Sequence, residues 1–447
     1  MPRLDSCAAA AAALTALAIG GGAQAAGYAL KEQSTTAQGA AFAGASASAS
    51  DVSYMFFNPA SLGWVERVEI EAMATAVMPK VKLERASGST ILGTPISGGT
   101  EEDDIAENAV LPAFYAAVPL PRGFRVGLGV NVPYGLETDY SRDWVGRYHG
   151  IRSEVTTVNI NPVLAWRPVP WLGLGGGFQA QYIDGTLTNA IDFGTIGASA
   201  GIPGSVPGAE DGHARLHGDD WAYGWNAGVI LEPVAGTRFG VSYRSEVDHT
   251  LRGDVNFTGD DAGIANLIRA GTGAFADTDA DLSLTTPASL SFGLHHDLTD
   301  RVALMAEAQW TDWSVFDQLT VKFDNPAQPD SVTEEEWRDT WFFAVGGTFK
   351  ATEQLTLRAG VAYDQSPVRG DYRTPRIPDG DRYWLSLGAG WQPTSWLGLD
   401  AAFTYIDVDD TSVRLSASDT GSAARGNLSA DYESYIVLVG LSARMRF

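Results

Sequence analysis

The side chains that could carry out catalysis are spread along this chain rather than grouped in one motif. Six histidines lie at positions 149, 213, 217, 249, 295 and 296. None has the spacing to a nucleophile and an orienting carboxylate that a hydrolytic site requires. The acidic runs at 101–104, 334–336 and 407–410 are typical of solvated loops rather than of metal sites. We therefore predict a protein that is not an enzyme and that has no catalytic residue, metal site or cofactor.

Apolar side chains, by contrast, recur in two long polar links of the chain, at 190–218 and 258–280. The members that we single out are Ile191, Phe193, Ile264 and Phe275. Apolar residues gathered in exposed loops suit a surface that receives a hydrophobic ligand, although each loop could instead use them for a small core of its own. We expect these four residues to contact a hydrophobic small molecule.

The elements that must position these loops are strands in which polar and apolar residues alternate, because side chains two apart share one face of a strand. About fourteen such segments follow residue 65, with ends uncertain by two to four residues. They lie at 67–83, 110–120, 124–133, 151–167, 171–189, 219–232, 237–257, 281–298, 301–323, 338–350, 354–367, 381–392, 396–407 and 430–447.

The alternation also predicts which side chains face outward. In the segment at 237–257, the outward face is expected to be apolar and the inward face charged. The outward residues would be Val241, Tyr243 and Val247, and the inward residues Arg244, Glu246 and Asp248. In the segment at 301–323 we expect Glu307 and Gln309 to face inward.

The connections between these segments alternate without exception between tight turns and long polar links. The long links lie at 84–109, 134–150, 190–218, 258–280, 324–337, 368–380 and 409–429. A membrane barrel with short periplasmic turns and long external loops has this pattern, whereas a soluble sandwich gives no reason for it. We therefore predict an all-β fold, a transmembrane antiparallel β-barrel of about 14 strands formed by residues 65–447.

Both ends of the chain agree with a barrel in the cell outer membrane. The last segment ends on Phe447, and a terminal aromatic residue belongs to the interfacial girdle of such barrels. Residues 1–25 are predicted to be a signal peptide, with Arg3, an apolar core and an Ala-x-Ala cleavage site ending at Ala25. The only cysteine, Cys7, lies in this leader, so we expect no disulfide.

The composition restricts the classes of molecule that this protein is expected to contact. The net charge of −24 argues against nucleic acid, which attracts basic proteins. The 13 Trp and 15 Tyr residues suit the two interfaces of a membrane. We expect a monomer that is surrounded by outer-membrane lipid and lipopolysaccharide.

Residues 26–64 do not follow the strand pattern. They are rich in Ala, Ser and Gly, and their aromatic residues include Tyr28, Phe42 and Phe57. A disordered leader is one alternative, but small residues pack closely and aromatic rings favour burial. We predict a compact hatch inside the barrel, with these rings facing the ligand. Its corner would be a turn or helix-start signal made of Asn58, Pro59 and Ala60.

The third segment, at 124–133, contains residues that weaken a strand. Gly127 and Gly129 lie within it, Pro133 ends it and Gly135 follows. Proline cannot donate a hydrogen bond to the ladder. An ordinary strand end is the alternative to a functional gap at these four residues.

Several short motifs, taken together and in this order, resemble the long-chain fatty-acid transporter family of the outer membrane (FadL). They occur at 26–30 (Ala-Gly-Tyr-Ala-Leu), 57–60 (Phe-Asn-Pro-Ala), 221–228, 243–247 (Tyr-Arg-Ser-Glu-Val), 310–314 (Trp-Thr-Asp-Trp-Ser), 364–368 (Asp-Gln-Ser-Pro-Val) and 377–384. The resemblance implies a fourteen-stranded barrel with an amino-terminal hatch that takes up long-chain fatty acids or aromatic hydrocarbons. It also implies an external apolar groove, a pocket above the hatch and a lateral gap at the third strand.

One departure from the family concerns the partner of a fatty-acid carboxylate. The fifth strand contains Gln181 and Asp184 where the fatty-acid members would have a basic residue. Arg382 is our candidate to replace it, with Arg152, Lys322 and Arg358 as alternatives. The sequence therefore predicts passive uptake of hydrophobic molecules, most simply long-chain fatty acids. Neutral or aromatic hydrocarbons, or a porin for hydrophilic solutes, stay open.

Overall fold

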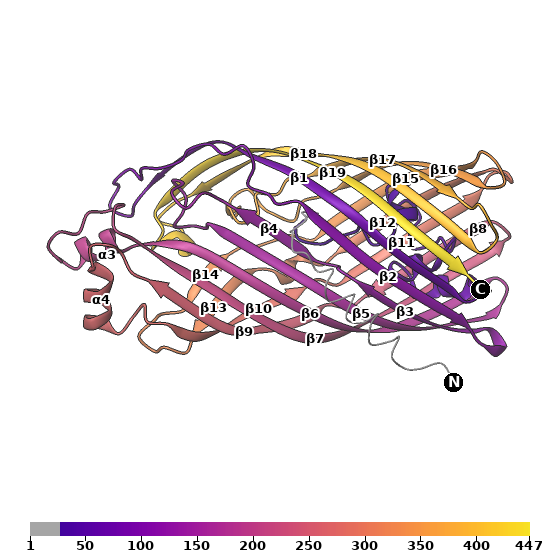
Figure 1. The fold of residues 1–447 in the computed structure, drawn as a ribbon, viewed down its shortest axis with the longest axis horizontal. Coiled ribbons are helices and arrows are strands. Elements are labelled where there is room, and N and C mark those ends of the chain that lie inside the picture. The colour runs from indigo at the N-terminus through magenta and orange to yellow at the C-terminus, as the bar shows by residue number, and fades with distance from the viewer. Residues whose placement is uncertain (1–26) are drawn as a thin grey trace.

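The computed structural model describes residues 27–447, which form one closed antiparallel sheet (Figure 1). Five barrel strands are each interrupted once, so nineteen strand segments make a barrel of fourteen strands, as predicted. The predicted leader, residues 1–25, lies outside the described residues. In chain order the segments are β1 (Glu69–Ser89), β2 (Ala109–Pro119), β3 (Phe124–Asn131), β4 (Gly135–Asp139), β5 (Arg152–Val169), β6 (Leu172–Asp192), β7 (Asp211–Val234), β8 (Thr237–Arg244), β9 (Val247–Thr258), β10 (Thr278–Thr286), β11 (Ser289–Asp297), β12 (Val302–Thr311), β13 (Gln318–Phe323), β14 (Ser331–Glu334), β15 (Thr340–Lys350), β16 (Leu355–Asp364), β17 (Arg382–Trp391), β18 (Leu397–Leu415) and β19 (Asn427–Arg446).

The helices of the described residues are short. They are α2 (Thr35–Gln38), η1 (Val52–Phe56), η2 (Pro59–Trp64), η3 (Pro121–Gly123), α3 (Phe193–Ser199), α4 (Ile264–Thr272), η4 (Trp313–Val315) and η5 (Thr420–Ser422). Within residues 27–447, none of them is long and apolar enough to cross a membrane.

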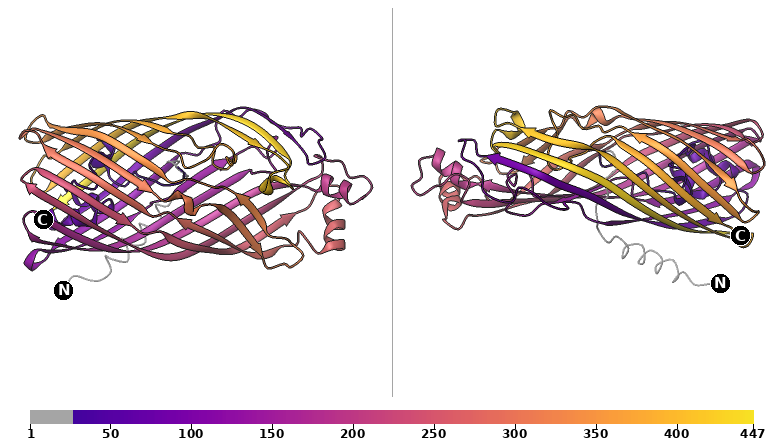
Figure 2. Two further views of the ribbon diagram at one scale, coloured as in Figure 1. Left: turned by 180° about the vertical axis from the view of Figure 1, so that it is seen from behind. Right: turned by 90° about the horizontal axis from the view of Figure 1, so that it is seen from above.

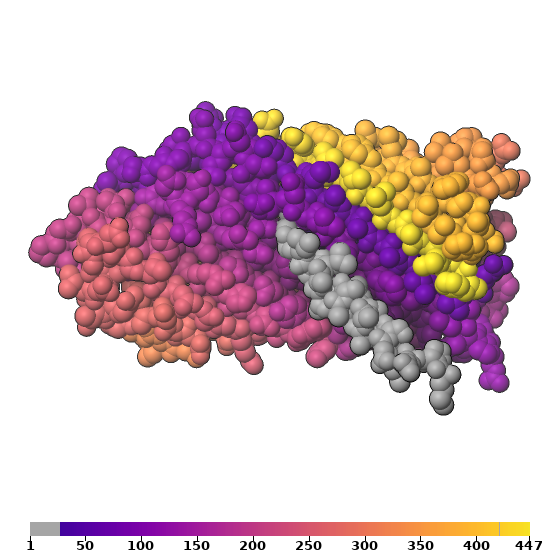
Figure 3. All heavy atoms as spheres, viewed as in Figure 1, coloured from indigo at the N-terminus to yellow at the C-terminus, as the bar shows by residue number. Residues whose placement is uncertain are grey.

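The barrel closes between its first and last strands. β1 and β19 pair antiparallel from Glu69 opposite Arg446 to Ser89 opposite Asn427, and the two strands lie side by side on the outer surface (Figure 3). A closed ladder pairs the backbone groups of every wall strand, which allows a sheet to sit in lipid. The outward side chains are largely apolar, with exposed rings that include Trp171, Trp221, Tyr223, Trp225, Tyr383, Trp391, Trp396, Tyr405 and Tyr435.

Several strands are longer than the sequence predicted, and the predicted long links are correspondingly shorter. β1 continues to Ser89, β7 begins at Asp211 and β18 continues to Leu415. The predicted links at 134–150 and 324–337 also contain β4 and β14. The outward residues of these extensions are polar, because the extensions project beyond the apolar band into water, whereas their inward residues include apolar ones such as Leu216 and Val413. They continue the ladder, but their apolar residues are too few to give the alternation on which the prediction relied.

The predicted facing is correct for β8 and wrong for β9. Val241 is exposed outward, and the Arg244 guanidinium lies inside, where it donates to the Phe56 carbonyl at 2.7 Å. Val247, however, is buried inside, and Glu246 and Asp248 are exposed. Ser245 and Glu246 belong to neither strand, so the phase of the alternation shifts between β8 and β9. Such a shift moves every later side chain to the opposite face.

The described part of the amino-terminal region, residues 27–64, lies inside the barrel at the end where the carboxyl terminus is found (Figure 2). It contains α2, η1 and η2, and most of its side chains are buried against the wall. The inward Glu307 of β12 accepts a hydrogen bond from Ser46 N at 3.1 Å, and Gln309 accepts one from Lys31. The predicted inward facing of β12 is therefore correct.

Glycines of the inner wall let this segment pack directly against the barrel backbone. A Cβ atom at Gly240 would lie 1.9 Å from the Ser46 carbonyl oxygen, and one at Gly175 would lie 2.3 Å from the Pro59 carbonyl carbon. Both distances are far too short for any real side chain. Similar close approaches to residues 39–64 occur at Gly173, Gly228, Gly293, Gly346, Gly360 and Gly388.

Candidate ligand-binding site

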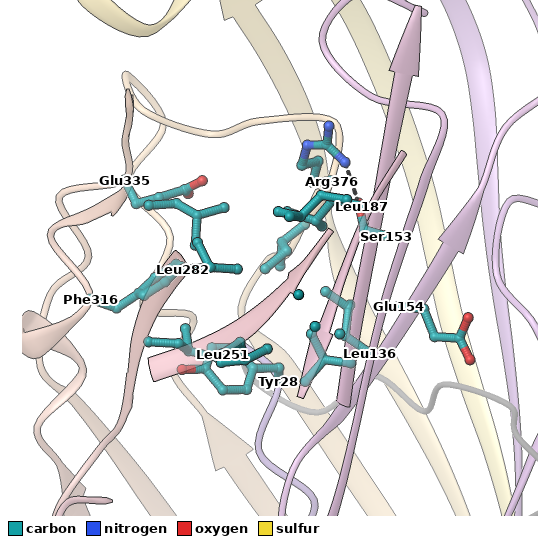
Figure 4. A pocket seen from close by; sticks show the side chains of 18 residues that line it. Tyr28, Leu136, Ser153, Glu154, Leu187, Leu251, Leu282, Phe316, Glu335 and Arg376 are labelled. Atoms are coloured by element: carbon teal, nitrogen blue, oxygen red, sulfur yellow. Dashed lines mark hydrogen bonds between the residues drawn. The ribbon is translucent and has the colours of Figure 1, made fainter. Parts of the chain in front are cut away.

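An apolar pocket lies in the lumen between residues 27–64 and the loops at the opposite end of the barrel (Figure 4). Its volume is about 60 Å³, and an adjoining pocket of about 70 Å³ shares Leu187, Leu216 and Leu319 with it. Its lining is aliphatic and aromatic apart from a few groups at its edge. The apolar residues are Tyr28, Leu136, Val155, Leu187, Leu216, Leu251, Leu282, Leu284, Phe316, Leu319 and Ile377.

The phase shift between β8 and β9 creates one wall of this pocket. Leu251 and Val255 point inward only because the alternation restarts after Glu246. In the uninterrupted phase that the sequence predicted, Thr250 and Arg252 would point inward instead. The interruption thus replaces polar wall residues by apolar ones beside the neighbouring Leu282 and Leu284 of β10.

Tyr28 forms the floor of the pocket. Its ring packs edge-on against Trp313 with centroids 4.9 Å apart, and also contacts Tyr134, Phe316 and Trp337. Its hydroxyl donates to the Thr285 carbonyl at 3.2 Å. The predicted ligand residue Tyr28 is therefore part of the pocket lining.

The backbone around Tyr28 pairs with the interrupted third barrel strand. Leu30 N donates to the Pro133 carbonyl at 2.8 Å, and Gly135 N donates to the Tyr28 carbonyl at 2.9 Å. β3 pairs with β2 up to Val130, whereas β4 pairs with β5 but, within residues 27–447, not with β2. The wall ladder is thus broken beside Pro133 and Gly135, and residues 28–30 lie along the broken edge.

The other two predicted gap residues lie in β3 itself. A Cβ at Gly127 would lie 2.5 Å from Leu62 Cδ1, and one at Gly129 would lie 3.2 Å from the Tyr115 ring. Gly127 and Gly135 therefore face side chains of the inner segment, Leu62 and Leu30, whereas Gly129 faces the Tyr115 ring of the wall.

A single guanidinium reaches the apolar pocket. Arg376 lies in the link between β16 and β17 and donates to Ser153 Oγ at 2.8 Å and to the carbonyls of Arg152 and Thr188. All of these partners are neutral oxygens. No ion pair of the described residues includes Arg376, so its charge is available to an anionic ligand.

Glu335 lines the pocket opposite Arg376 (Figure 4). Burial raises the pKa of Glu335 to about 8, against the smaller lowering by the Trp337 indole, which donates to its carboxylate at 3.2 Å, and by Arg376 and Arg425. At neutral pH this carboxyl group is largely protonated. It therefore leaves the positive charge of Arg376 mostly uncompensated.

The remaining predicted ligand residues lie elsewhere. Phe42 and Phe57 pack against each other within the inner segment, with ring centroids 5.8 Å apart, and neither lines the apolar pocket. The candidates from the external links form a cluster around α3 and α4 in which Phe193 is fully buried, and its members Ile191 and Phe275 also pack against the apolar residues of the lumen. Its predicted members are Ile191, Phe193, Ile264 and Phe275.

Arg382 is also separate from the apolar pocket. It is almost fully buried, and its guanidinium binds Asp379 Oδ1. The other oxygen of Asp379 accepts hydrogen bonds from Gly27 N at 3.0 Å and Ser366 Oγ at 2.7 Å. In this structure Arg382 holds a carboxylate of the chain itself, beside the start of the described segment.

The predicted corner at Asn58, Pro59 and Ala60 anchors the inner segment to the wall. The Asn58 amide donates to the carbonyls of Ser46 at 2.7 Å and Val229 at 3.2 Å. Its oxygen accepts from Ala60 N at 2.9 Å, and Pro59 is the first residue of η2. The corner is a helix cap that also ties two parts of the segment to β7.

Sequence reasoning missed Arg376, Glu335 and the leucines of the lumen wall. Leu251 was hidden by the phase shift, whereas Arg376 precedes the Ile-Pro-Asp motif at 377–379 and could have been noticed there. Residues 27–447 contain no group of three His, Cys, Asp or Glu side chains that could hold a metal ion.

Comparison with known proteins decides the family. The model of a family described as outer membrane protein transport protein (OMPP1/FadL/TodX) matches residues 16–447. The chain belongs to this family. A putative outer membrane protein of Neisseria meningitidis serogroup B is 32% identical over 444 residues, with 95% of each chain covered. The long-chain fatty acid transport protein of Escherichia coli K12 is 27% identical, covering 85% of this chain and 87% of its own.

Solved structures of the OMPP1/FadL/TodX family share the fold. The crystal structure of a Pseudomonas aeruginosa FadL homologue is 29% identical, has a TM-score of 0.86 and covers 94% of this chain and 100% of its own. The Ralstonia pickettii toluene transporter TbuX has a TM-score of 0.67 at 18% identity, covering 93% and 99%. At that identity the likeness shows the fold alone.

Membership of the OMPP1/FadL/TodX family confirms several predictions. The protein is a barrel of the outer membrane and a transporter of hydrophobic compounds. It is a transport channel and not an enzyme. The similar proteins include a long-chain fatty acid transport protein and, by fold, a toluene transporter, so membership leaves the substrate open.

Proposed function

We propose that this protein takes up long-chain fatty acids across the outer membrane. The observation that carries the proposal is Arg376, a guanidinium without an anionic partner at the edge of a pocket that is otherwise apolar. A pocket for a neutral hydrocarbon has no need of a buried charge, whose burial is unfavourable when it is unpaired. A fatty acid matches both parts of the site, because its carboxylate can pair with Arg376 and its alkyl chain can fill the apolar pocket.

The proposed binding energy comes from two terms. Each buried methylene contributes about 0.8 kcal/mol, and hydrogen bonds to a charged group contribute about 1.5–3 kcal/mol. A long alkyl chain therefore binds without metal or nucleotide. Transport in this proposal is passive, because the burial of the alkyl chain supplies the driving force.

The proposed route has three stages. A ligand first contacts the external apolar cluster at its half-buried members Ile191 and Phe275, and then enters the apolar pocket above Tyr28. Residues 26–64 act as a hatch that closes the lumen below it. The ligand leaves sideways, where the ladder is broken beside Pro133 and Gly135, and residues 65–447 form the barrel of a monomer in lipid and lipopolysaccharide.

The direct test is uptake by cells that lack their own transporter. Cells that express this barrel are expected to take up radiolabelled oleate, and unlabelled oleate should compete far better than toluene or hexadecanol. Toluene uptake that oleate does not inhibit would contradict the proposal. It would favour the second candidate, a carrier of neutral or aromatic hydrocarbons, which the ring cluster around Tyr28 would suit.

Binding of fatty acid is expected to weaken as the pH rises from about 6 to about 8.5, because Glu335 ionises around its pKa of about 8. An ionised Glu335 repels the ligand carboxylate, whereas the protonated form does not. Titration of laurate by isothermal calorimetry at several pH values measures the effect. The Glu335→Gln variant, which keeps the acceptor for Trp337, should lose most of this pH dependence, and hexadecanol should show none. A pH dependence that is unchanged in Glu335→Gln would contradict the assignment.

Filling the broken edge is expected to slow uptake. A Cβ at Gly135 would lie 3.0 Å from Leu30 Cδ1, so Gly135→Val narrows the gap against a side chain that can move aside. The same holds for Gly129→Val against Tyr115. Oleate uptake should fall while heat-modifiable migration on gels shows a folded barrel. Unchanged uptake in both folded variants would exclude this lateral route.

A further inference from the structure

A second pocket lies beyond Arg376 on the side of the external loops. It has a volume of about 300 Å³ and a polar lining. Arg376 lines both this polar pocket and the apolar pocket, and the bridging pocket of about 70 Å³ reaches both, through Leu187 on one side and Thr333 and Arg425 on the other. The three cavities therefore adjoin one another and share residues of their linings.

The inner part of the polar pocket is positively charged. Arg425 is the second guanidinium of the lining, and its hydrogen bonds go to the hydroxyls of Thr333 at 3.1 Å and Ser331 at 3.4 Å. Like Arg376, it takes part in no ion pair of residues 27–447. The guanidiniums of Arg376 and Arg425 thus line the same pocket, and the hydrogen bonds that they donate go to neutral oxygens.

Two further buried side chains in this pocket each have a polar atom without a hydrogen-bond partner. His149 is 4% exposed and its Nε2 makes no hydrogen bond, and Thr374 is 6% exposed and its Oγ1 makes none. Both residues line the polar pocket. Buried polar atoms are nearly always hydrogen-bonded in folded proteins. The Thr374 hydroxyl, which can donate, and the two guanidiniums beside it therefore indicate the place of an anionic group.

The rim of the same pocket is negatively charged. Its carboxylates are Glu334, which is half-buried, and Asp371 and Asp419, which are exposed. None of the three belongs to an ion pair of the described residues. From the barrel interior outward, the lining is therefore first apolar, then cationic, then anionic.

We propose that the two pockets together bind a zwitterionic single-chain amphiphile of the lysophospholipid class, with its phosphate at Arg376 and Arg425 and its ammonium group at Glu334, Asp371 and Asp419. The order of groups in such a molecule is alkyl chain, phosphate and ammonium, and it matches the order of the lining. A fatty acid fills the first two zones only. The inference rests on the proposed function, because the alkyl chain uses the same apolar pocket.

The test compares three probes with the same alkyl chain on the full barrel in lipid nanodiscs: laurate, dodecyl phosphate and dodecylphosphocholine. The wild-type protein should bind dodecylphosphocholine more tightly than dodecyl phosphate in calorimetric titrations. The combined variant Glu334→Gln, Asp371→Asn and Asp419→Asn should bind dodecylphosphocholine several-fold more weakly, with laurate binding retained. The control combines Glu336→Gln, Asp261→Asn and Asp410→Asn, which remove three exposed carboxylates outside the pocket and should change nothing.

The outcomes separate the two proposals. Dodecylphosphocholine binding that is no tighter than dodecyl phosphate binding, or that falls equally in the rim variant and its control, overturns this inference while laurate binding still supports fatty-acid transport. Failure of all three probes overturns the proposed function as well. Arg425→Leu adds a second check, since Arg425 does not line the apolar pocket. It should weaken both phosphate probes more than laurate, and an equal loss of all three contradicts the phosphate position.

Discussion

Replacing Arg376 by leucine is expected to weaken the binding of oleate or laurate about 10- to 100-fold, because hydrogen bonds to a charged group contribute about 1.5–3 kcal/mol and each 1.4 kcal/mol is tenfold in affinity. Binding of hexadecanol or toluene should change little, since these ligands have no charge for the guanidinium to meet. Competition with a fluorescent fatty acid on the purified barrel measures both. The same variant should lower oleate uptake by cells at limiting concentration.

The structure offers a matched control for Arg376→Leu. Arg369 lies in the same link, is half-exposed and pairs with Glu336 at 3.8 Å, so Arg369→Leu should leave oleate binding unchanged. Arg376→Lys should retain part of the affinity, because the charge remains although the fork of donors is lost. Equal loss of oleate and hexadecanol in Arg376→Leu would mean that the residue shapes the pocket rather than binding a carboxylate.

A valine at Gly240 or Gly175 is expected to displace the inner segment and open the lumen to ions. At both positions a Cβ would overlap backbone atoms, of Ser46 and Pro59 respectively, and a backbone cannot rotate aside as a side chain can. Overpacking of this kind costs about 1–3 kcal/mol. Here it destabilises the packing of the inner segment against the barrel wall. Single-channel recording in planar bilayers should show frequent conducting states that the wild-type barrel lacks.

The control for this experiment is Gly176→Val, one residue along β6 from Gly175. A Cβ at Gly176 has no neighbour nearer than 3.7 Å, so this variant should conduct as little as the wild type. A closed channel in folded Gly240→Val and Gly175→Val would show that the segment does not depend on these contacts. A wild-type barrel that conducts freely would instead support the porin that the sequence left open.

The barrel could be predicted from sequence because its rules are local. The alternation in the last strand up to Phe447, and the regular exchange of short and long connections, needed no knowledge of the rest of the chain. The number of strands followed directly. The strand ends beyond the apolar band could not be predicted, since stretches such as 211–218 are polar on the outward face and have only Ala214 and Leu216 as apolar residues.

The ligand pocket could not be predicted because it depends on long-range contacts. Arg376 is far in sequence from Ser153 and Tyr28, and only the closed barrel brings them to one pocket. Ser245 and Glu246, which belong to neither strand, shift the phase between β8 and β9, so the inward leucine of β9 was assigned to the lipid side. Tyr28 was found because an aromatic ring among small residues needs a partner, which here is the cluster around Trp313.

The most direct measurement is a structure of the barrel with bound oleate at saturating concentration. The account predicts the carboxylate within hydrogen-bonding distance of the Arg376 guanidinium and the alkyl chain among Leu251, Leu282 and Leu284, above Tyr28. Oleate bound only at the outer loops or on the lipid-facing wall, with no density beside Arg376, would contradict it.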